Sequence, residues 1–412
     1  MTRCNIGIFY PADPIGQIPG GIDTIIRSIM EQAPEDLTYT LFGATSDANA
    51  RPVGRKISIA DGRSHFVPLI RADPAAVRKL VPLSLRYFFE LRQYLRAGRL
   101  REVDILDFHR IDPTIALFAH DPRPKNVMIH QDMTILRNKD CDIGWRHAPW
   151  LYERMERTFF PQLDRIVCVR ESAIERYRRM FPDIADRFAF LPTWVDATVF
   201  HPATSQGERQ AARDYISSKC DVPPPAKLLV FVGRLDRQKD PLLLVEAMRL
   251  VCKAEPQICV LLIGDGSLRH AVESRIDALN LRSHFRILGA CAPVFVAEVL
   301  RAADLFVMSS AYEGMPIAVL EALASGVPVV TTDVGEVARV VRNGCNGEIV
   351  AVRTPEALAD GVQNVLLHLD ALRGAPCRQA VAPYSPERAL SQIFEHHRGQ
   401  AARRGLKRAG AT

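Results

Sequence analysis

The segment 233–239 (GRLDRQK) carries the residue types best suited to binding an anion. It follows an apolar run and stands just before Pro241, a residue that suits the first turn of a helix. Arg234 and Lys239 are five residues apart in this segment. A guanidinium binds phosphate oxygens as a planar fork and an ammonium binds them as a point charge, so the two cations could hold one phosphate group. The alternative is that both are solvated surface cations.

A second segment, 313–321 (EGMPIAVLE), places two glutamates around the start of a predicted helix. Gly314 would let the backbone approach a ligand closely, and the free N–H groups of a helix that starts at Pro316 would point at that ligand. Glu313 lies in the loop, whereas Glu321 lies inside an otherwise apolar helix. A carboxylate there is costly unless it accepts hydrogen bonds, for instance from ribose hydroxyls. The alternative is a capping residue and a surface glutamate.

The N-terminal half of the sequence offers fewer such residues. Gly20 and Gly21 stand before a predicted helix, where paired glycines form either an anion or sugar-oxygen site or simply a tight turn. His109 and His130 each follow a predicted strand. A lone histidine is more often structural than functional. His130 is the stronger candidate of the two, because polar residues follow it toward the expected ligand.

Several motifs are missing from the sequence, and their absence narrows the function. Gly264-Asp265-Gly266 is followed by Arg269, so the dinucleotide fingerprint G-x-G-x-x-G is not completed. The sequence also lacks a phosphate-binding P-loop and the G-x-S-x-G elbow of serine hydrolases. NAD enzymes, P-loop NTPases and common serine hydrolases are therefore disfavoured. The nine cysteines form no C-x-x-C pair and no cluster at zinc spacing, which predicts reduced thiols in the cytosol.

The elements that must position these residues alternate along the whole chain. Short apolar runs separated by helical patterns predict parallel sheets covered by helices on both faces. Polar residues from about 202 to 226, ending in a Pro-Pro-Pro run, predict a linker. The sequence therefore predicts an α/β protein with two Rossmann-like, doubly wound domains, whose ligands bind at the carboxyl ends of the strands. We predict a first domain over 1–198, a linker over 199–226 and a second domain over 227–382.

The composition is that of an ordinary globular protein, because 48% of the 412 residues are hydrophobic and 24% are charged. No apolar run approaches the roughly 20 residues of a membrane span, and no secretory signal opens the sequence, so we expect a cytoplasmic protein. The net charge of +6 suits an anionic substrate or an acidic membrane and does not require nucleic acid. The basic stretch 75–103 is either an amphipathic helix lying on an anionic inner-membrane surface or a core helix with a solvated face.

Together these motifs resemble those of the retaining GT-B glycosyltransferases of glycosyltransferase family 4. The resemblance is dense over about 190–352 and thin before it. The segments that carry it are Val232-Gly233-Arg234-Leu235 with Lys239, Ile263-Gly264-Asp265-Gly266, 309–316 (SSAYEGMP), 321–330 (EALASGVPVV), Gly20-Gly21, His130 and 191–196 (LPTWVD). Glu313 and Glu321 match the E-x₇-E signature of that family. Two segments depart from the family pattern. The often-found Pro-Asn-Gly-Val-Asp is replaced by 192–196 (PTWVD), and the often-found Gly-Gly-x-Pro-Glu is replaced by Gly335-Glu336-Val337-Ala338-Arg339.

The resemblance implies GT-B architecture, in which the two domains face a central cleft. The first domain would bind the acceptor and the second a nucleotide diphosphate sugar. The resemblance also implies that 383–412 hold a helix that crosses back to the first domain, followed by a basic tail.

The same resemblance assigns a role to each motif. Arg234 and Lys239 would neutralise the diphosphate, and Glu321 would hold the ribose. The donor sugar would be held by Glu313 and by the backbone of Gly314, Met315 and Pro316. Gly21 would offer its amide to the phosphates, and His130 would lie near the donor sugar. Gly20, Gly233, Gly264 and Asp265 complete the expected donor-binding set.

These roles lead to the expected reaction. Negative charge grows on the leaving diphosphate as the sugar–phosphate bond breaks, and fixed cations stabilise that transition state more than the ground state. We therefore expect a retaining hexosyl transfer from GDP-mannose or a UDP-sugar to a glycan or lipid-linked acceptor, with no metal and no further cofactor. Two alternatives stay open: a nucleotide-sugar epimerase or hydrolase of the same fold, and a nucleotide-sugar-binding protein without catalysis.

Overall fold

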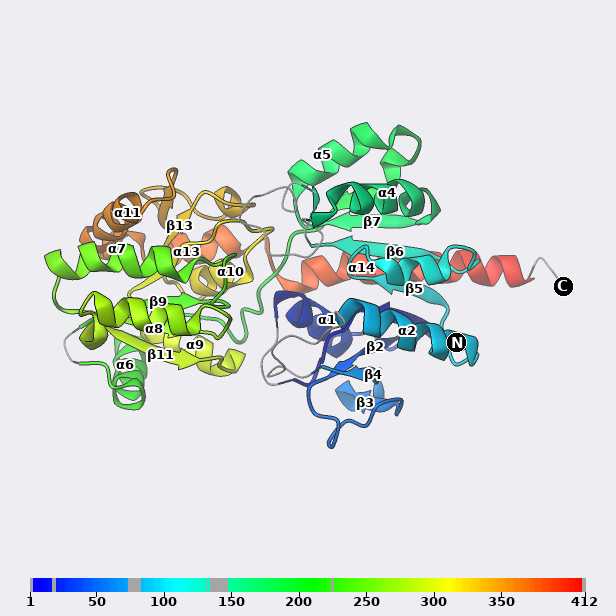
Figure 1. Ribbon diagram of the computed structural model, residues 1–412, viewed down its shortest axis with the longest axis horizontal. Helices are drawn as coiled ribbons and strands as arrows, with labels where there is room; N and C mark the ends of the chain where they lie inside the picture. The colour runs from blue at the N-terminus through cyan, green and yellow to red at the C-terminus, as the bar shows by residue number, and fades with distance from the viewer. Residues whose placement is uncertain are drawn as a thin grey trace. The chain divides into compact units, whose positions relative to one another are not determined.

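The computed structural model describes residues 3–16, 20–72, 83–130, 132–133, 147–223 and 226–409. The chain divides into two compact units, and each has its own sheet of mainly parallel strands (Figure 1). Unit 1 comprises Met1–Leu136, His147–Pro192 and Glu387–Thr412, and unit 2 comprises Arg137–Arg146 and Thr193–Pro386. Among the described residues, no helix has both the length and the apolar character that crossing a membrane requires.

Unit 1 is built on an eight-stranded sheet of order β3-β4-β2-β1-β5-β6-β7-β8. Its strands are β1 (Cys4–Phe9), β2 (Leu37–Thr45), β3 (Ile57–Ile59), β4 (Ser64–Arg71), β5 (Ile105–Phe108), β6 (Lys125–Ile129), β7 (Arg165–Cys168) and β8 (Phe188–Phe190). The α-helices described in this unit are α1 (Gly21–Glu31), α2 (Leu83–Arg96), α4 (Pro149–Phe159), α5 (Glu171–Met180) and α14 (Pro386–Ala409). All pairings are parallel except that of β3 with β4. The central strands read as continuous apolar runs because both faces are covered.

Unit 2 is built on a six-stranded sheet of order β11-β10-β9-β12-β13-β14, parallel throughout. Its strands are β9 (Lys227–Val232), β10 (Ile258–Ile263), β11 (Phe285–Gly289), β12 (Leu305–Met308), β13 (Val329–Thr332) and β14 (Gly347–Val350). The α-helices described in this unit are α6 (Gln206–Cys220), α7 (Pro241–Ala254), α8 (Arg269–Ala278), α9 (Pro293–Ala302), α10 (Ile317–Ala324), α11 (Pro355–Leu367), α12 (Leu369–Leu372) and α13 (Ala375–Val381).

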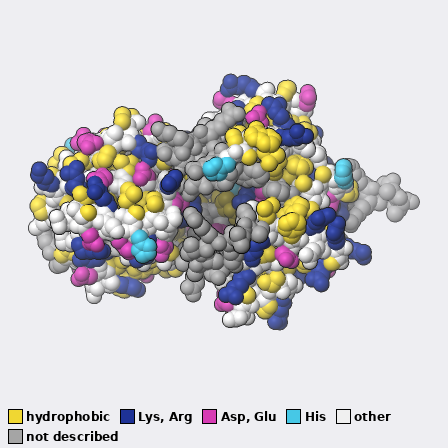
Figure 2. Space-filling view, viewed as in Figure 1, with side chains coloured by type: hydrophobic (Ala, Val, Ile, Leu, Met, Phe, Trp, Pro, Cys, Tyr) yellow, Lys and Arg dark blue, Asp and Glu magenta, His cyan; other side chains and the backbone are white. Residues whose placement is uncertain are grey.

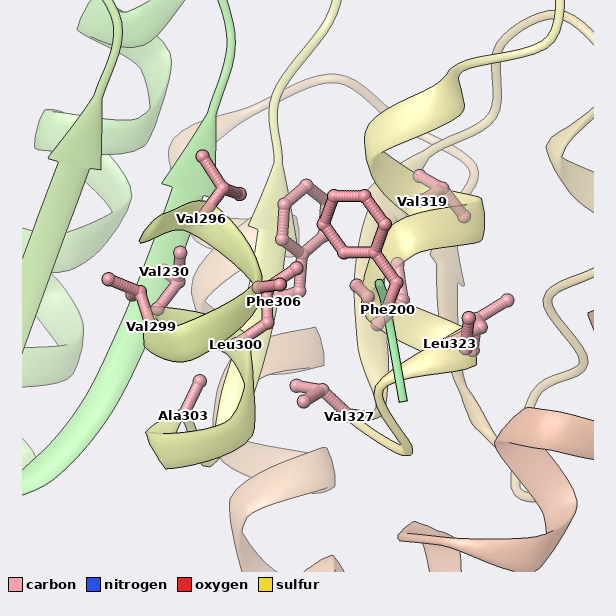
Figure 3. Packing of buried hydrophobic residues seen from close by; sticks show 14 of the residues in the cluster. Phe200, Val230, Val296, Val299, Leu300, Ala303, Phe306, Val319, Leu323 and Val327 are labelled. Atoms are coloured by element: carbon pink, nitrogen blue, oxygen red, sulfur yellow. The ribbon is translucent and has the colours of Figure 1, made fainter. Parts of the chain in front are cut away.

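Side chains of β9 alternate between two cores, as the two-residue period of a strand requires. Leu228 and Val230 pack with α6, α9, α10 and α13 on one face of the unit 2 sheet. Leu229 and Phe231 pack with α7, α8 and α11 on the other face. In Figure 3, the rings of Phe200 and Phe306 lie between the helix that carries Leu300 and the helix that carries Leu323. This double core fixes the strand ends from which the candidate site projects.

The segment 199–226, predicted as a linker, differs from that expectation. Residues Gln206–Cys220 form helix α6, whose N-cap Ser205 accepts a hydrogen bond from the amide of Glu208. Ile216 and Cys220 of this helix are buried in the core of unit 2. The helix is polar on most of its circumference, so its narrow apolar stripe gave a weak sequence signal.

The end of the chain contributes helix α14, whose residues from Glu387 onward belong to unit 1. Tyr39 Oη and His397 Nδ1 lie 2.8 Å apart, and the amides of Asn126 and Gln400 exchange two hydrogen bonds of 2.9 and 3.0 Å. These buried polar contacts fix the register of the helix on the strands of unit 1. Of the basic stretch 75–103, the part before Leu83 lies outside the described residues.

Candidate active site

The candidate site of unit 2 lies at the point where its strand order reverses. Strands β9 and β12 are neighbours in the sheet, while the connections that leave their carboxyl ends lead to opposite sides. Ligands of open parallel sheets bind in the crevice at such a switch point. The loop after β9 holds Arg234 and Lys239, and the loop after β12 holds Glu313. The fold therefore brings the two segments singled out in the sequence to one place.

Glu313 is held by side chains from both loops. Its Oε1 accepts hydrogen bonds from Lys239 Nζ at 2.6 Å and from Ser310 Oγ at 2.7 Å, and its Oε2 accepts one from Gln238 Nε2 at 3.3 Å. Glu313 is only 6% exposed. A buried carboxylate is tolerable when it is paired and hydrogen-bonded, and Glu313 meets both conditions. Its geometry is thus fixed before any ligand is bound.

Arg234 is connected to the same network through Gln238. Its Nη2 donates to Gln238 Oε1 at 3.0 Å, and its Nη1 lies 2.9 Å from Asp236 Oδ2. The Arg234 side chain is 63% exposed, whereas Asp236 and Gln238 are buried. The guanidinium is therefore anchored at its base and still accessible to an anion in solvent. Arg234 is thus a solvent-exposed cation that is also part of a hydrogen-bonded network.

Glu321 lies on α10 in the second turn of the helix, half-buried beside the network. Burial raises the pKa of its carboxyl group to about 7, against a smaller opposite effect of Lys239. Among the described residues, no donor hydrogen-bonds this carboxylate. A half-buried acceptor without a donor suits a ligand that supplies hydroxyl groups.

Gly264, which was predicted to bind the donor, and the nearby Gly266 have a packing role in the structure. A Cβ at Gly264, whose φ is +137°, would lie 1.9 Å from the carbonyl oxygen of Gly233. A Cβ at Gly266 would lie 2.4 Å from the carbonyl oxygen of Leu235. Asp265 binds within its own loop, because its carboxylate accepts from the Gly266 amide at 2.7 Å and from Arg269 Nη1 at 3.2 Å. These residues hold the loops after β9 and β10 against each other.

The start of α10 presents backbone amides next to Glu313. Pro316 is the N-cap residue, not the first helical residue as predicted, and no side chain caps the helix. The first amides of a helix have no partner inside it, so they remain available to an anion or a sugar oxygen. Met315 is buried in the core, and its carbonyl oxygen accepts from Thr193 Oγ1 at 3.2 Å. Gly314 is partly exposed between these two fixed residues.

The loop 335–339, which departs from the family pattern, forms its own ion pair. Glu336 Oε2 accepts from Arg339 Nε at 2.6 Å, and the Glu336 amide donates to the Gly314 carbonyl at 2.9 Å. Gly335 has φ +59°, and a Cβ there would lie 2.1 Å from that same carbonyl oxygen. The retained glycine thus allows this loop to contact the loop that carries Glu313.

The remaining predicted residues lie in unit 1, at the carboxyl ends of neighbouring strands. Gly20 is the N-cap of α1, its amide donates to Asp23 Oδ2 at 2.8 Å, and Gly21 is the first helical residue. His130 follows β6 and stacks on His109, which follows β5, with 5.5 Å between ring centroids. Burial lowers the pKa of His130 to about 3, so the ring is neutral at pH 7.

Comparisons with known proteins show what this chain is similar to. Residues 213–373 match the family model of glycosyl transferases group 1. The chain is 30% identical over 277 residues to a D-inositol 3-phosphate glycosyltransferase of Corynebacterium urealyticum, covering 65% of this chain and 63% of that protein. It is 24% identical over 205 residues to an Escherichia coli UDP-Gal:alpha-D-GlcNAc-diphosphoundecaprenol alpha-1,3-galactosyltransferase, covering 49% of each. The chain thus spans between about half and 63% of the length of these relatives.

Solved structures show the GT-B architecture. Sucrose-phosphate synthase from Thermosynechococcus elongatus superposes with a TM-score of 0.79 at 19% identity, covering 97% of this chain and 100% of that one. WaaG, a glycosyltransferase involved in lipopolysaccharide biosynthesis, superposes with a TM-score of 0.69 at 16% identity, covering 94% and 99%. The fold predicted from the sequence is therefore confirmed, and residues 213–373 are similar to the glycosyl transferases group 1.

Two residues of the candidate site escaped the sequence analysis. Gln238 joins Arg234 to Glu313, and Ser310 hydrogen-bonds Glu313. Both stand inside the quoted segments, but a glutamine and a serine carry no charge that marks them as special. Their buried positions at the ends of β9 and β12 were the available signal, because a buried polar side chain needs a hydrogen-bond partner.

In the described part of the chain, no group of three or more His, Cys, Asp or Glu side chains is placed to hold a metal ion. The triplet Asp140-Cys141-Asp142 lies outside the described residues. The charges that the site does supply come from Arg234 and Lys239. An anion bound beside them would meet one exposed guanidinium and one ammonium already fixed by Glu313.

Proposed function

We propose that this chain is a retaining, metal-independent glycosyltransferase. In this proposal it moves a hexose from a nucleotide diphosphate sugar, either GDP-mannose or a UDP-sugar, to a glycan or lipid-linked acceptor in polysaccharide or glycolipid synthesis. The observation that carries the proposal is the network of Arg234, Gln238, Lys239 and Glu313 at the switch point of the unit 2 sheet.

The network suits a nucleotide diphosphate sugar group by group. The exposed guanidinium of Arg234 and the ammonium of Lys239 would bind the diphosphate. The carboxylate of Glu321, which has no donor among the described side chains, would accept hydrogen bonds from the ribose hydroxyls. Glu313 and the first amides of α10 would hold the donor sugar. The crystal structure of Anabaena HepE in complex with UDP-glucose supports a UDP-sugar as the donor.

The proposed chemistry breaks the bond between the anomeric carbon and the diphosphate oxygen. The acceptor hydroxyl oxygen forms its new bond to the anomeric carbon on the same face of the sugar, and its proton passes to an oxygen of the leaving diphosphate. Arg234 and Lys239 stabilise the charge that develops on that diphosphate, so removing either should slow the chemical step. His130 would face the donor sugar as a neutral ring.

The acceptor and the cellular location belong to the same proposal. The Escherichia coli relative is named for a diphosphoundecaprenol acceptor, which supports a lipid-linked acceptor. We place the protein in the cytoplasm, in peripheral contact with the inner membrane surface. Helix α2 would make this contact, because it exposes Leu85 and Phe89 next to Arg92 and Arg96.

The experiment uses the purified chain with GDP- and UDP-sugars and a panel of polyprenyl-diphosphate glycans. Arg234→Ala and Glu313→Ala should each lower kcat at least about 100-fold. Arg237→Ala, an exposed cation of the same loop, is the matched control and should keep full activity. A chelator should leave the rate unchanged, and NMR of the product should show the anomeric configuration of the donor.

Each alternative predicts a different result in the same assay. Release of nucleoside diphosphate without any glycoside product would indicate the hydrolase or epimerase. Tight nucleotide-sugar binding with no turnover across the acceptor panel would indicate the binding protein. Full activity in both Arg234→Ala and Glu313→Ala would overturn the proposed site.

A further inference from the structure

His109 and His130 form a hydrogen-bonded pair at the carboxyl edge of the unit 1 sheet. The Nδ1 of His109 lies 3.2 Å from the Nε2 of His130, and the ring planes differ by 15°. The two residues follow β5 and β6, which are neighbouring parallel strands. Each ring is thus fixed to a strand end, and the sheet sets the distance between the two rings.

The two members of the pair differ in their surroundings. His109 is 1% exposed and lies near the ring of Tyr10, with 6.3 Å between the ring centroids. His130 is half-buried, and among the described residues His109 is its single hydrogen-bond partner. The His109 ring is therefore fixed by the packing around it, and the His130 ring is fixed by its hydrogen bond to His109.

Burial lowers the pKa of both rings, so both are neutral at pH 7. A hydrogen bond between two neutral imidazoles needs one N–H donor and one bare nitrogen. The proton on one ring therefore dictates the tautomer of the other. The Nδ1 of His130, the ring nitrogen not used in the pair, is then fixed as either a donor or an acceptor.

A merely structural role for His109 would be better served by an apolar side chain. His109 also lines a cavity of about 60 Å³ together with Asp107, Asn126 and His397. Imidazoles in this place cost desolvation free energy, and the hydrogen bond to His130 offsets only part of it. The polar pair is best explained by what it does for His130.

We propose that His109 is a positioning residue that fixes the ring plane and the tautomer of His130 for sugar transfer. This inference rests on the proposed function, in which His130 faces the donor sugar. His109 itself would touch neither substrate. Its loss should therefore act on the chemical step more than on donor binding.

The test begins with ¹⁵N NMR of histidine-labelled protein, in which the His130 signals are assigned by their loss in His130→Asn. In the wild-type chain we expect one His130 tautomer. In His109→Phe, which keeps a ring but removes the hydrogen bond, we expect a mixture of both tautomers. The same variant should lower kcat at least tenfold while the donor KM changes less than threefold. His109→Asn, whose amide can replace Nδ1, should restore most of the activity.

His65→Phe is the control, since His65 is a half-buried histidine of β4 in the same unit, on a strand that is not a neighbour of β5 or β6. It should leave the His130 tautomer and kcat unchanged. The inference is overturned if His109→Phe keeps one tautomer and full kcat, or if His65→Phe loses as much kcat. If His109→Phe does not fold, His109→Asn and His109→Gln are compared, and equal kcat in the two would overturn it. Absence of sugar transfer by the wild-type chain would instead overturn the proposed function, and the tautomer would still report on the pair.

Discussion

At the residue scale, the network around Glu313 holds a buried carboxylate and a largely buried ammonium group in fixed positions. Glu313 is 6% exposed and Lys239 is held against it at 2.6 Å, so both charges are largely removed from water. Such a pair adds little net stability, but a single unpaired partner is strongly destabilising. The pair therefore fixes the two groups in the position where a diphosphate sugar would meet them.

A double-mutant comparison tests this coupling. Lys239→Met should lower the free energy of unfolding by about 3 kcal/mol, because it leaves the Glu313 carboxylate buried without its cation. Lys239→Met combined with Glu313→Gln should recover most of that loss. Arg237→Met provides the control for removing an exposed cation. The free energy of unfolding of the wild type and the three variants is measured by urea denaturation. If Lys239→Met and the double variant lose equal free energy of unfolding, the two residues are not coupled.

The carboxyl group of Glu321 predicts a pH dependence. Burial raises its pKa to about 7, whereas an exposed glutamate titrates near 4.3. The folded chain therefore holds this proton more tightly than the unfolded chain, and the resulting stability is lost as pH rises from about 5 through 7. In the same range the carboxylate forms, and an ionised group accepts hydroxyl hydrogen bonds more strongly.

Nucleotide affinity should accordingly increase between pH 6 and 8. Isothermal titration with UDP and GDP across that range should show tighter binding at the higher pH for the wild-type chain. Glu321→Gln should bind more weakly and show a flatter profile. If the affinity of Glu321→Gln depends on pH as that of the wild type does, then Glu321 does not bind the nucleotide.

At the element scale, the sequence predicted the strands of unit 2 and the central strands of unit 1 well, and it missed the two edge strands of unit 1. Strands such as β9 and β10 are buried on both faces, so each reads as one apolar run. Strands β3 and β8 have three residues each, too few to show a period, and both lie at sheet edges. Helix α6 was taken for a linker because tertiary packing, not its polar sequence, makes it a stable helix.

In the candidate site, too, some features could be predicted from the sequence and others could not. Charged residues at strand ends were found because parallel topology brings such ends together. The contact between the loops after β9 and β10 was not foreseen, since nothing in Gly264-Asp265-Gly266 states which backbone it will meet. Contacts between residues far apart in the sequence decide whether a glycine makes room for a ligand or for a neighbouring loop.

Gly264→Ala tests the role of that loop contact. The added Cβ would collide with the Gly233 carbonyl at 1.9 Å, so we expect the free energy of unfolding to fall by at least about 3 kcal/mol and nucleotide binding to weaken. Gly344→Ala is the matched control, because Gly344 also has a positive φ, +70°, and no atom within 4 Å of the added Cβ. It should cost about 1 kcal/mol from backbone strain alone. Equal losses in chemical denaturation of the two variants would show that strain, not the collision, dominates.

At the scale of the whole molecule, the distribution of charge matters more than its sum of +6. Figure 2 shows hydrophobic side chains gathered on the face of unit 1 that carries α2, with Lys and Arg side chains beside them. Tyr87 and Leu91 of α2 are buried in unit 1. Leu85 and Phe89 of the same helix are 40% and 53% exposed. One helix thus presents an apolar stripe to the core and a second apolar group to the outside.

This second group predicts reversible binding to anionic membranes. Burial of Leu85 and Phe89 at a lipid surface would add a hydrophobic contribution to the attraction of the nearby arginines for acidic head groups. The wild-type chain should co-sediment with phosphatidylglycerol vesicles at low salt and dissociate as salt screens the charges. Phe89→Ser should lower the bound fraction several-fold. Val294→Ser, which removes a side chain that is 62% exposed in unit 2, is the matched control and should bind like the wild type. If the wild type and Phe89→Ser bind equally, or if neither binds at low salt, then the second apolar group of α2 does not contact membranes.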